Sequence, residues 1–133
     1  KMSKSESDKG TIYLLEDLAI TRKKIMSAVT DSDNTIVYDM ENKPGISNLL
    51  TIMSVLSGKS IDELCATYNG QGYGVFKKAV ADVVCDTLKD LQDKVKEIQS
   101  SGMIDKVLQE GAEKASYYAR KKVAKVYRKV GLR

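Results

Sequence analysis

The first five residues, Lys1-Met2-Ser3-Lys4-Ser5, place two lysines and two serines in one short polar segment. Lysine is a mobile point charge that suits phosphate, and each serine hydroxyl can donate a further hydrogen bond. The segment is therefore a candidate site for an anionic ligand. Taken alone, it is better explained as a solvated chain end, because such ends are also rich in lysine and serine.

A second candidate site lies near the other end of the chain, where cationic and aromatic side chains are interleaved. Residues 117–133 contain seven basic side chains and no acidic one. The candidate RNA-binding residues are Arg120, Lys121, Lys122, Lys125, Arg128 and Lys129, with Tyr117, Tyr118 and Tyr127 among them. Cations neutralise phosphates and aromatic rings stack on exposed bases, so the pattern favours a contact with RNA. The alternative is a solvated helix end whose lysines suit the helix dipole. A membrane-surface helix is disfavoured, because the apolar positions are valine and alanine.

The composition excludes several kinds of catalytic and metal site. The chain has no histidine, which removes imidazole acid–base catalysis, a serine–histidine triad and histidine metal ligands. Cys65 and Cys85 lack the C-x-x-C spacing of zinc sites, and their apolar surroundings predict buried thiols. The glycine-rich stretch 69–74 follows a predicted helix rather than a strand, so we interpret it as a turn and not as a phosphate loop.

The 133 residues are enough for one domain with a buried core. No apolar run reaches the roughly 18 residues of a membrane span, and the N-terminal region lacks a signal-peptide pattern. A cytoplasmic location is therefore expected. The net charge of +4 is uneven, because residues 1–100 carry −2 and residues 101–133 carry +6. The basic character belongs to the C-terminal arm.

The spacing of apolar residues predicts a mainly α-helical fold, a helical bundle with one or two short extended segments near its N-terminus. Residues 11–15 predict a small strand, and residues 35–39 a further strand or an extended connector. A helix is expected to begin after Asp17 as its N-cap and to end near residue 30.

Three further helix signals follow the only Pro-Gly pair of the chain. Ser47 and Asn48 are expected to cap an apolar helix that ends at Gly58. Ser60 and Glu63 have the spacing of a capping box, which predicts a short third helix. Two long amphipathic helices, separated by Ser100-Ser101-Gly102, are then expected to pack as an antiparallel pair.

Three stretches of the sequence resemble a known family. Residues 1–5 match the Lys-Met-Ser-Lys-Ser motif of class I aminoacyl-tRNA synthetases letter for letter. More specific are Thr30-Asp31-Ser32 with residues 39–50 (DMENKPGISNLL), and residues 72–77 (GYGVFK). The chain resembles the C-terminal portion of the bacterial-type tryptophanyl-tRNA synthetases over its whole length, most closely over residues 1–90.

The resemblance implies a ligase that activates tryptophan with MgATP and attaches it to its tRNA. Lys1, Met2, Ser3, Lys4 and Ser5 would form the ATP-contacting loop, in which Lys4 and Lys1 would be catalytic through their charge on the phosphates. No residue of this chain would ligate Mg. The resemblance also implies a loop and connector over residues 1–44 and a helical tRNA- or anticodon-binding domain over residues 45–133.

The resemblance implies further parts upstream of Lys1. These are the histidine-bearing class I motif, the Rossmann-type catalytic domain, the tryptophan pocket and the homodimer contacts. We therefore expect a piece of a longer enzyme that is catalytically inactive alone, with no membrane partner. Two alternatives remain: a non-catalytic helical RNA-binding module, or a structural bundle whose basic end contacts an acidic protein.

Overall fold

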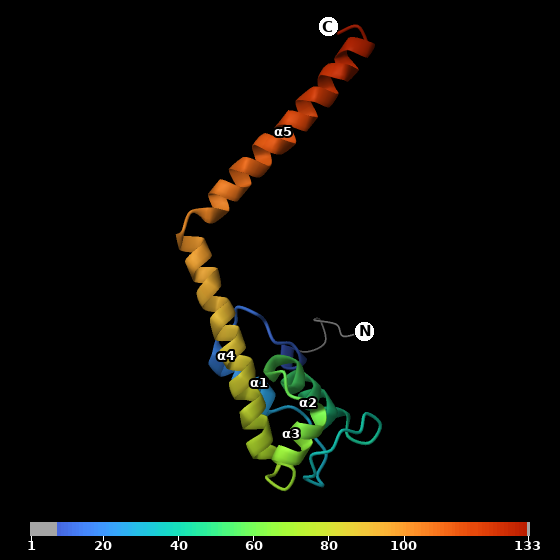
Figure 1. Cartoon of the computed structure of the whole chain (residues 1–133), viewed down its shortest axis with the longest axis vertical. Helices are drawn as coiled ribbons and strands as arrows, with labels where there is room; N and C mark the ends of the chain where they lie inside the picture. The colour runs from blue at the N-terminus through green and yellow to red at the C-terminus, as the bar shows by residue number, and fades with distance from the viewer. Residues whose placement is uncertain (1–7, 133) are drawn as a thin grey trace. The chain divides into compact units, whose positions relative to one another are not determined.

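The computed structural model describes residues 8–132, and all their regular elements are helical (Figure 1). In chain order they are the 3-10 helix η1 (Asp8–Gly10) and the α-helices α1 (Leu18–Met26), α2 (Pro44–Ser57), α3 (Ile61–Tyr68), α4 (Tyr73–Ser100) and α5 (Met103–Lys129). The chain divides into two compact units, one ending at Gln92 and the next beginning at Asp93. The prediction of a mainly α-helical fold is confirmed.

The strand predicted over residues 11–15 is wrong. These residues form a loop, and residues 35–39 are a connector without regular structure. The described residues offer the first stretch no partner strand, and side chains bind its backbone carbonyls instead. The Lys24 ammonium donates to the Thr11 carbonyl at 2.8 Å, and the Gln92 amide donates to the Leu14 carbonyl at 3.1 Å. A β-prone stretch without a partner strand satisfies its polar groups in this way.

Most helix ends lie where local chemistry predicts them. The Asp17 carboxylate accepts from the Ala19 N–H at 2.7 Å, which makes Asp17 the N-cap of α1. Ser60 and Glu63 form a complete capping box at the start of α3. Gly58 follows α2 at φ 71°, a left-handed conformation that costs glycine little.

The start of α2 differs from the prediction of a cap at Ser47 and Asn48. The helix begins at Pro44, because proline has no N–H to satisfy and its fixed φ suits the first helical position. Ser47 is fully buried inside the helix, and its hydroxyl accepts from the Asp39 N–H at 2.8 Å. The serine therefore holds the connector rather than the helix end.

The core of the first unit combines the connector with all four of its α-helices, and α1 contributes Ile25. Its largest fully buried apolar side chains are Ile36 from the connector, Ile46 and Leu50 from α2, Leu64 from α3, and Phe76 and Val80 from α4. The Tyr68 and Phe76 rings meet at 5.4 Å between centroids. Burial of these apolar groups is the main stabilising term of the unit.

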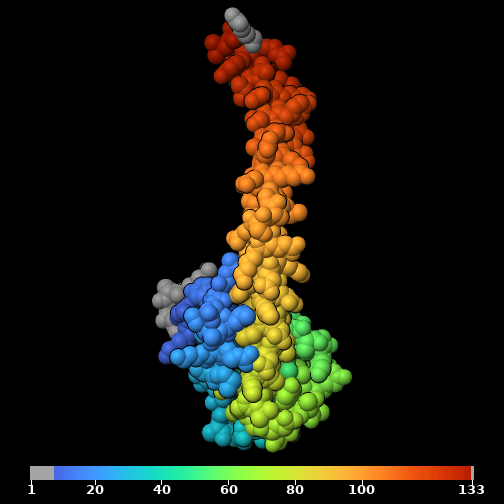
Figure 2. Space-filling model, turned by 90° about the vertical axis from the view of Figure 1, so that its left-hand side faces the viewer, coloured from blue at the N-terminus to red at the C-terminus, as the bar shows by residue number. Residues whose placement is uncertain are grey.

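Helix α1 lies against α4 within the same unit (Figure 2). The Arg22 guanidinium is 2.6 Å from the Asp82 carboxylate, and the Cys85 thiol donates to the Leu18 carbonyl at 3.5 Å. The predicted burial of Cys85 is confirmed, whereas Cys65 is only partly buried. Burial raises the pKa of both thiols, as expected for unreactive structural cysteines.

The second unit has no buried residue in α5. The predicted apolar stripe is present on the helix, with Ile104, Leu108 and Val126 exposed by 45%, 64% and 48%. The burial that this stripe predicts is therefore not seen among the described residues.

The connector between α1 and α2 is fastened by an ammonium group, in a cluster that we call the Lys43 knot. The Lys43 ammonium binds the carboxylates of Asp31 and Asp33, and it lies 3.4 Å from the Thr35 carbonyl and 3.3 Å from the Tyr73 hydroxyl. The Tyr73 hydroxyl donates to the Asp31 carboxylate and lies 3.0 Å from that of Asp33. The knot thus joins the connector to the first residues of α2 and α4.

The groups of the knot shift one another's pKa values. The hydrogen bond from Lys43 holds the pKa of Asp33 well below its usual range. Burial opposes the charge of Lys43, but the hydrogen bonds to Asp33 and Tyr73 outweigh it and raise the pKa of the ammonium. Burial, together with the hydrogen bond to Asp31, raises the pKa of Tyr73 to about 12. The charged lysine and aspartate and the neutral tyrosine therefore belong to the folded state.

Gly45 allows α2 to approach the connector, which yields a test of the fold. A Cβ on Gly45 would lie 2.2 Å from the Val29 carbonyl oxygen, whereas a Cβ on Gly74 in α4 meets nothing within 4 Å. We expect Gly45→Ala to lower the free energy of unfolding by about 1–3 kcal/mol, and Gly74→Ala to leave it unchanged or raise it slightly. Urea unfolding measures both variants, and equal effects would contradict the close approach.

The Lys43 knot predicts a loss of stability at alkaline pH. Because the folded-state pKa of Tyr73 is raised from about 10 to about 12, its contribution is complete below pH 10 and disappears as the pH rises through this window. We expect Tyr73→Phe to cost about 1 kcal/mol at neutral pH and to lose less stability between pH 10 and 12 than the parent. Tyr38→Phe, at a connector tyrosine whose hydroxyl has no hydrogen bond to a described residue, is the matched control. An unchanged alkaline loss in Tyr73→Phe would refute the assignment.

Candidate functional site

The predicted anion-binding residues Lys1, Met2, Ser3, Lys4 and Ser5 lie outside the residues that the structure describes. The described chain that follows them is held against α1 by a lysine. The Lys24 ammonium is 2.7 Å from the Glu16 carboxylate and 3.3 Å from that of Asp8. The hydrogen bond between Lys24 and Glu16 lowers the pKa of Glu16 and raises the pKa of Lys24. Both groups are therefore charged, and the pair connects η1 and the following loop to α1.

The six predicted RNA-binding residues all lie on α5 and are all exposed. Five of them fall within about 120° around the helix axis, and Arg120 lies outside this sector. Lys121, Lys125 and Arg128 have the spacing i, i+4, i+7 and form one row along the helix. Lys122 and Lys129 form a second row, which is rotated about 100° from Lys121 around the helix axis, the rotation of one residue. Arg120 lies on the other side of the first row. The helix thus groups five of the six residues on one side and separates Arg120 from them.

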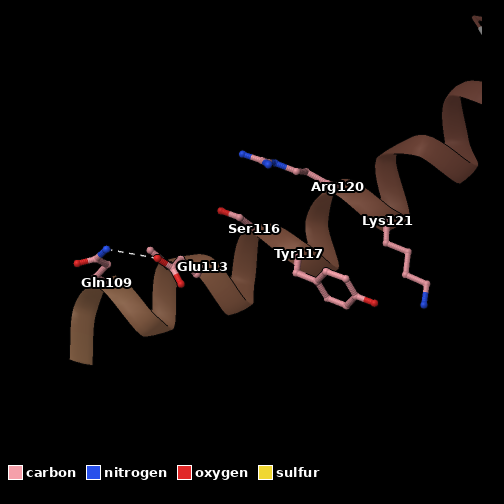
Figure 3. A pocket seen from close by; sticks show the side chains of 7 residues that line it. Gln109, Glu113, Ser116, Tyr117, Arg120 and Lys121 are labelled. Carbon is pink, nitrogen blue, oxygen red and sulfur yellow. Dashed lines mark hydrogen bonds between the residues drawn. The ribbon is translucent and has the colours of Figure 1, made fainter. Parts of the chain in front are cut away.

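A hollow of about 760 Å³ on one side of α5 is lined by Tyr117, one of the three tyrosines of this region. Its lining residues are Gln109, Ala112, Glu113, Ser116, Tyr117, Arg120 and Lys121. Arg120 and Lys121 project to different sides of the helix, and the Tyr117 ring lies on the side of Lys121 (Figure 3). The hollow is therefore bordered by one cation on each side, with the exposed ring on the side of Lys121.

The aromatic rings in this region are placed for both stacking and cation contact. The Lys121 ammonium is 5.8 Å from the centroid of the Tyr117 ring, within cation–π range. The rings of Tyr117 and Tyr118 meet edge to face at 5.4 Å between centroids. Both tyrosines remain more than 60% exposed. Their faces are accessible to a base, while the neighbouring ammonium groups are accessible to phosphate.

The electrostatic field near the end of α5 is positive. Glu113 is the last acidic residue of the chain, and the amide of Gln109 donates to its carboxylate at 3.3 Å. No carboxylate follows it to offset the six cations. A positive stripe of this kind attracts polyanions, with an affinity that salt reduces.

Two features of the structure are not predicted from the sequence. One feature is the polar lining of the hollow by Gln109, Glu113 and Ser116. The only sequence signal for it is helical spacing, which places these three residues on the same side of the helix as Arg120. The Lys43 knot joins residues 31, 33, 43 and 73, and no local pattern indicates such distant partners.

The described residues contain no cluster of three or more side chains suited to hold a metal ion. No helix in residues 8–132 is long and apolar enough to cross a membrane.

Comparisons with known proteins agree with the resemblance seen in the sequence. A model of the family described as tRNA synthetases class I (W and Y) matches residues 1–89. The tryptophan–tRNA ligase of Bacillus anthracis is 48% identical over 133 residues, covering 99% of this chain and 40% of the relative. That of Corynebacterium efficiens is 47% identical, covering 98% of this chain and 38% of the relative.

The fold comparison gives the same result. The crystal structure of tryptophanyl-tRNA synthetase from Mycoplasma pneumoniae matches with a TM-score of 0.72 and 31% identity, over 96% of this chain and 40% of that chain. The chain spans about 40% of the length of the relatives it matches. The family match includes the Lys-Met-Ser-Lys-Ser segment and covers well over half of the chain. The chain therefore belongs to the class I tRNA synthetases of the tryptophan and tyrosine type.

Proposed function

We propose that this chain is the C-terminal part of a tryptophan–tRNA ligase, the enzyme that activates tryptophan with ATP and attaches it to its tRNA. The observation that carries the proposal is the 48% identity to tryptophan–tRNA ligases over 99% of the chain. A binding module that had only borrowed the N-terminal motif would not match through α5. The ligase acts in the cytoplasm, as a homodimer whose contacts lie outside these residues.

The first part of the proposal concerns ATP. Lys1 and Lys4 contact the phosphates of MgATP, and Met2, Ser3 and Ser5 complete the ATP-contacting segment. Phosphoryl-centred chemistry needs charge stabilisation rather than a nucleophile from the protein. Two lysines and two hydroxyls supply that charge and the hydrogen bonds.

The second part concerns tRNA. The helical residues 45–133 bind tRNA, and residues 1–44 connect them to the catalytic part of the ligase. On α5, the contact is made by Arg120, Lys121, Lys122, Lys125, Arg128 and Lys129. The exposed Tyr117 and Tyr118 support this assignment, because cations bind phosphate while rings stack on bases.

A non-catalytic RNA-binding module is the second candidate function. The exposed basic surface of α5 favours it, because this surface needs no catalytic residue. The two functions differ in whether Lys1 and Lys4 matter for adenylate formation in the longer ligase.

We expect that the chain alone does not catalyse the first step, the activation of tryptophan with ATP. It has no histidine, and the histidine-bearing motif of class I enzymes is needed beside the Lys-Met-Ser-Lys-Ser segment. We therefore expect residues 1–133 to show no tryptophan-dependent ATP–pyrophosphate exchange above the buffer rate. Exchange by the purified chain would show that these residues hold a complete adenylation site and would refute the proposed division of roles.

Charge reversal on α5 tests the tRNA contact. We expect Lys121→Glu to weaken binding of a tryptophan tRNA transcript about fivefold to tenfold at low salt, and to reduce the slope of log affinity against log salt. Lys106→Glu changes the charge equally at an exposed α5 residue outside the six. Fluorescence anisotropy at several salt concentrations measures both. Equal affinities of the Lys121 variant and the parent would remove this face of α5 from the tRNA contact.

A further inference from the structure

A second cavity lies in the first unit, between α1 and the start of α2. Its volume is about 680 Å³, within the range of small-ligand sites. Its lining residues are Lys9, Gly10, Ile20, Lys23, Lys24, Ser27, Ala28, Val29, Gly45, Asn48 and Leu49. Three lysines and no acidic residue border it, so the lining favours an anion over a cation.

The three lysines differ in how far their charge is already used. Lys24 is bound to Glu16 and Asp8, and its ammonium also donates to the Thr11 carbonyl. Lys23, by contrast, is exposed, and its ammonium has no hydrogen-bond or ion-pair partner among the described residues. Lys9 also has a partner, so Lys23 is the cation with a charge left to bind a ligand.

The cavity also holds an amide with unused hydrogen-bonding capacity. Asn48 is exposed in the first half of α2, and its side chain bonds to no described residue. An asparagine amide offers two donors and an acceptor in one plane, which matches the edge of a nucleobase. A lysine ammonium offers donors only, and a serine hydroxyl carries its donor and its acceptor on one atom.

Apolar side chains form the rest of the wall. Val29 is 89% exposed and Ile20 is 51% exposed, whereas Leu49 is 4% exposed and belongs to the core. A valine exposed to this extent beside a cavity gains from any flat apolar surface that covers it. A free phosphate would use Lys23 and leave this wall uncovered.

We propose that this cavity holds one nucleotide of an RNA, with its phosphate on Lys23, its base edge on Asn48 and its base face against Ile20 and Val29. The inference rests on the proposed function, because it adds a second RNA contact to the one on α5. It places that contact on the first unit, next to the connector and the start of α2.

The experiment measures the affinity of the 133-residue chain for a tryptophan tRNA transcript by fluorescence anisotropy. Lys23→Glu tests the phosphate contact, and Lys89→Glu is its control, an equal charge change at an exposed α4 residue outside the cavity. Val29→Ser tests the apolar wall, and Val55→Ser is its control, at a valine of α2 that is 76% exposed. All four side chains are exposed, and circular dichroism checks that each variant is folded.

We expect Lys23→Glu to weaken binding about fivefold to tenfold and Lys89→Glu less than twofold at low salt. Val29→Ser should also weaken binding, whereas Val55→Ser should not. Equal effects of the two lysine variants would show a general charge effect and overturn the proposal. If Lys121→Glu loses binding and Lys23→Glu does not, the cavity proposal is overturned and the α5 contact stands. If Lys23→Glu loses binding and Lys121→Glu does not, the cavity proposal is supported and the α5 contact is refuted.

Adenosine monophosphate and inorganic phosphate separate the possible ligands. In a heteronuclear NMR titration of the labelled chain, adenosine monophosphate should shift the Asn48 side-chain amide and the Val29 methyl groups, and phosphate should shift neither at equal concentration. Equal shifts with phosphate would reduce the cavity to an anion site and refute the nucleotide assignment. Shifts with the mononucleotide but no competition by the tRNA transcript would refute the placement of the site in an RNA complex.

Discussion

The first unit depends on the ammonium group of Lys43, which lies between two connector carboxylates and the Tyr73 hydroxyl. It stabilises a part of the chain that lies outside the helices. Residues 27–43 contain no helix or strand, and such a stretch must find partners for its polar groups. Lys43 supplies them at one end. At the other end, the Lys77 ammonium of α4 donates to the Ala28 carbonyl at 2.8 Å and lies 3.0 Å from the Thr30 hydroxyl.

The connector is then fixed closely enough to contribute to the core. Ile36 is fully buried, and Asn34 accepts from the Tyr73 N–H at 2.8 Å. Removal of Lys43 would leave two carboxylates beside each other without a counter-charge, which is costly when a cluster is partly buried. The same fastening shapes the cavity between α1 and α2, because Val29 and Gly45 approach each other there.

The two units owe their stability to different physical sources. The first has a buried apolar core, whereas α5 has no buried residue and depends on helix propensity and its own side-chain pairs. The binding surface of a protein is often drawn from its least stable part. An RNA partner would supply α5 with the contacts that the described residues do not.

The sequence predicts the features that depend on local chemistry. Asp17, Gly58 and the Ser60–Glu63 pair act within a few residues of their own position, and each of these helix ends is confirmed. The Ser47 side chain is suited to a helix cap, but tertiary structure uses its hydroxyl for the Asp39 N–H. The knot and the cavity join residues far apart in the chain, so no periodicity indicates them. On α5, spacing predicts the helix and its basic residues, whereas the division of those residues into rows requires the helix geometry.

Hydrogen exchange with and without a tryptophan tRNA transcript tests the central claim that α5 is an RNA-binding surface. Because α5 buries nothing, its amides should exchange rapidly in the free chain, unlike those of the buried part of α4. We expect slower exchange over residues 117–129 when tRNA is added. Protection confined to α2 and α3, with α5 unchanged, would contradict it.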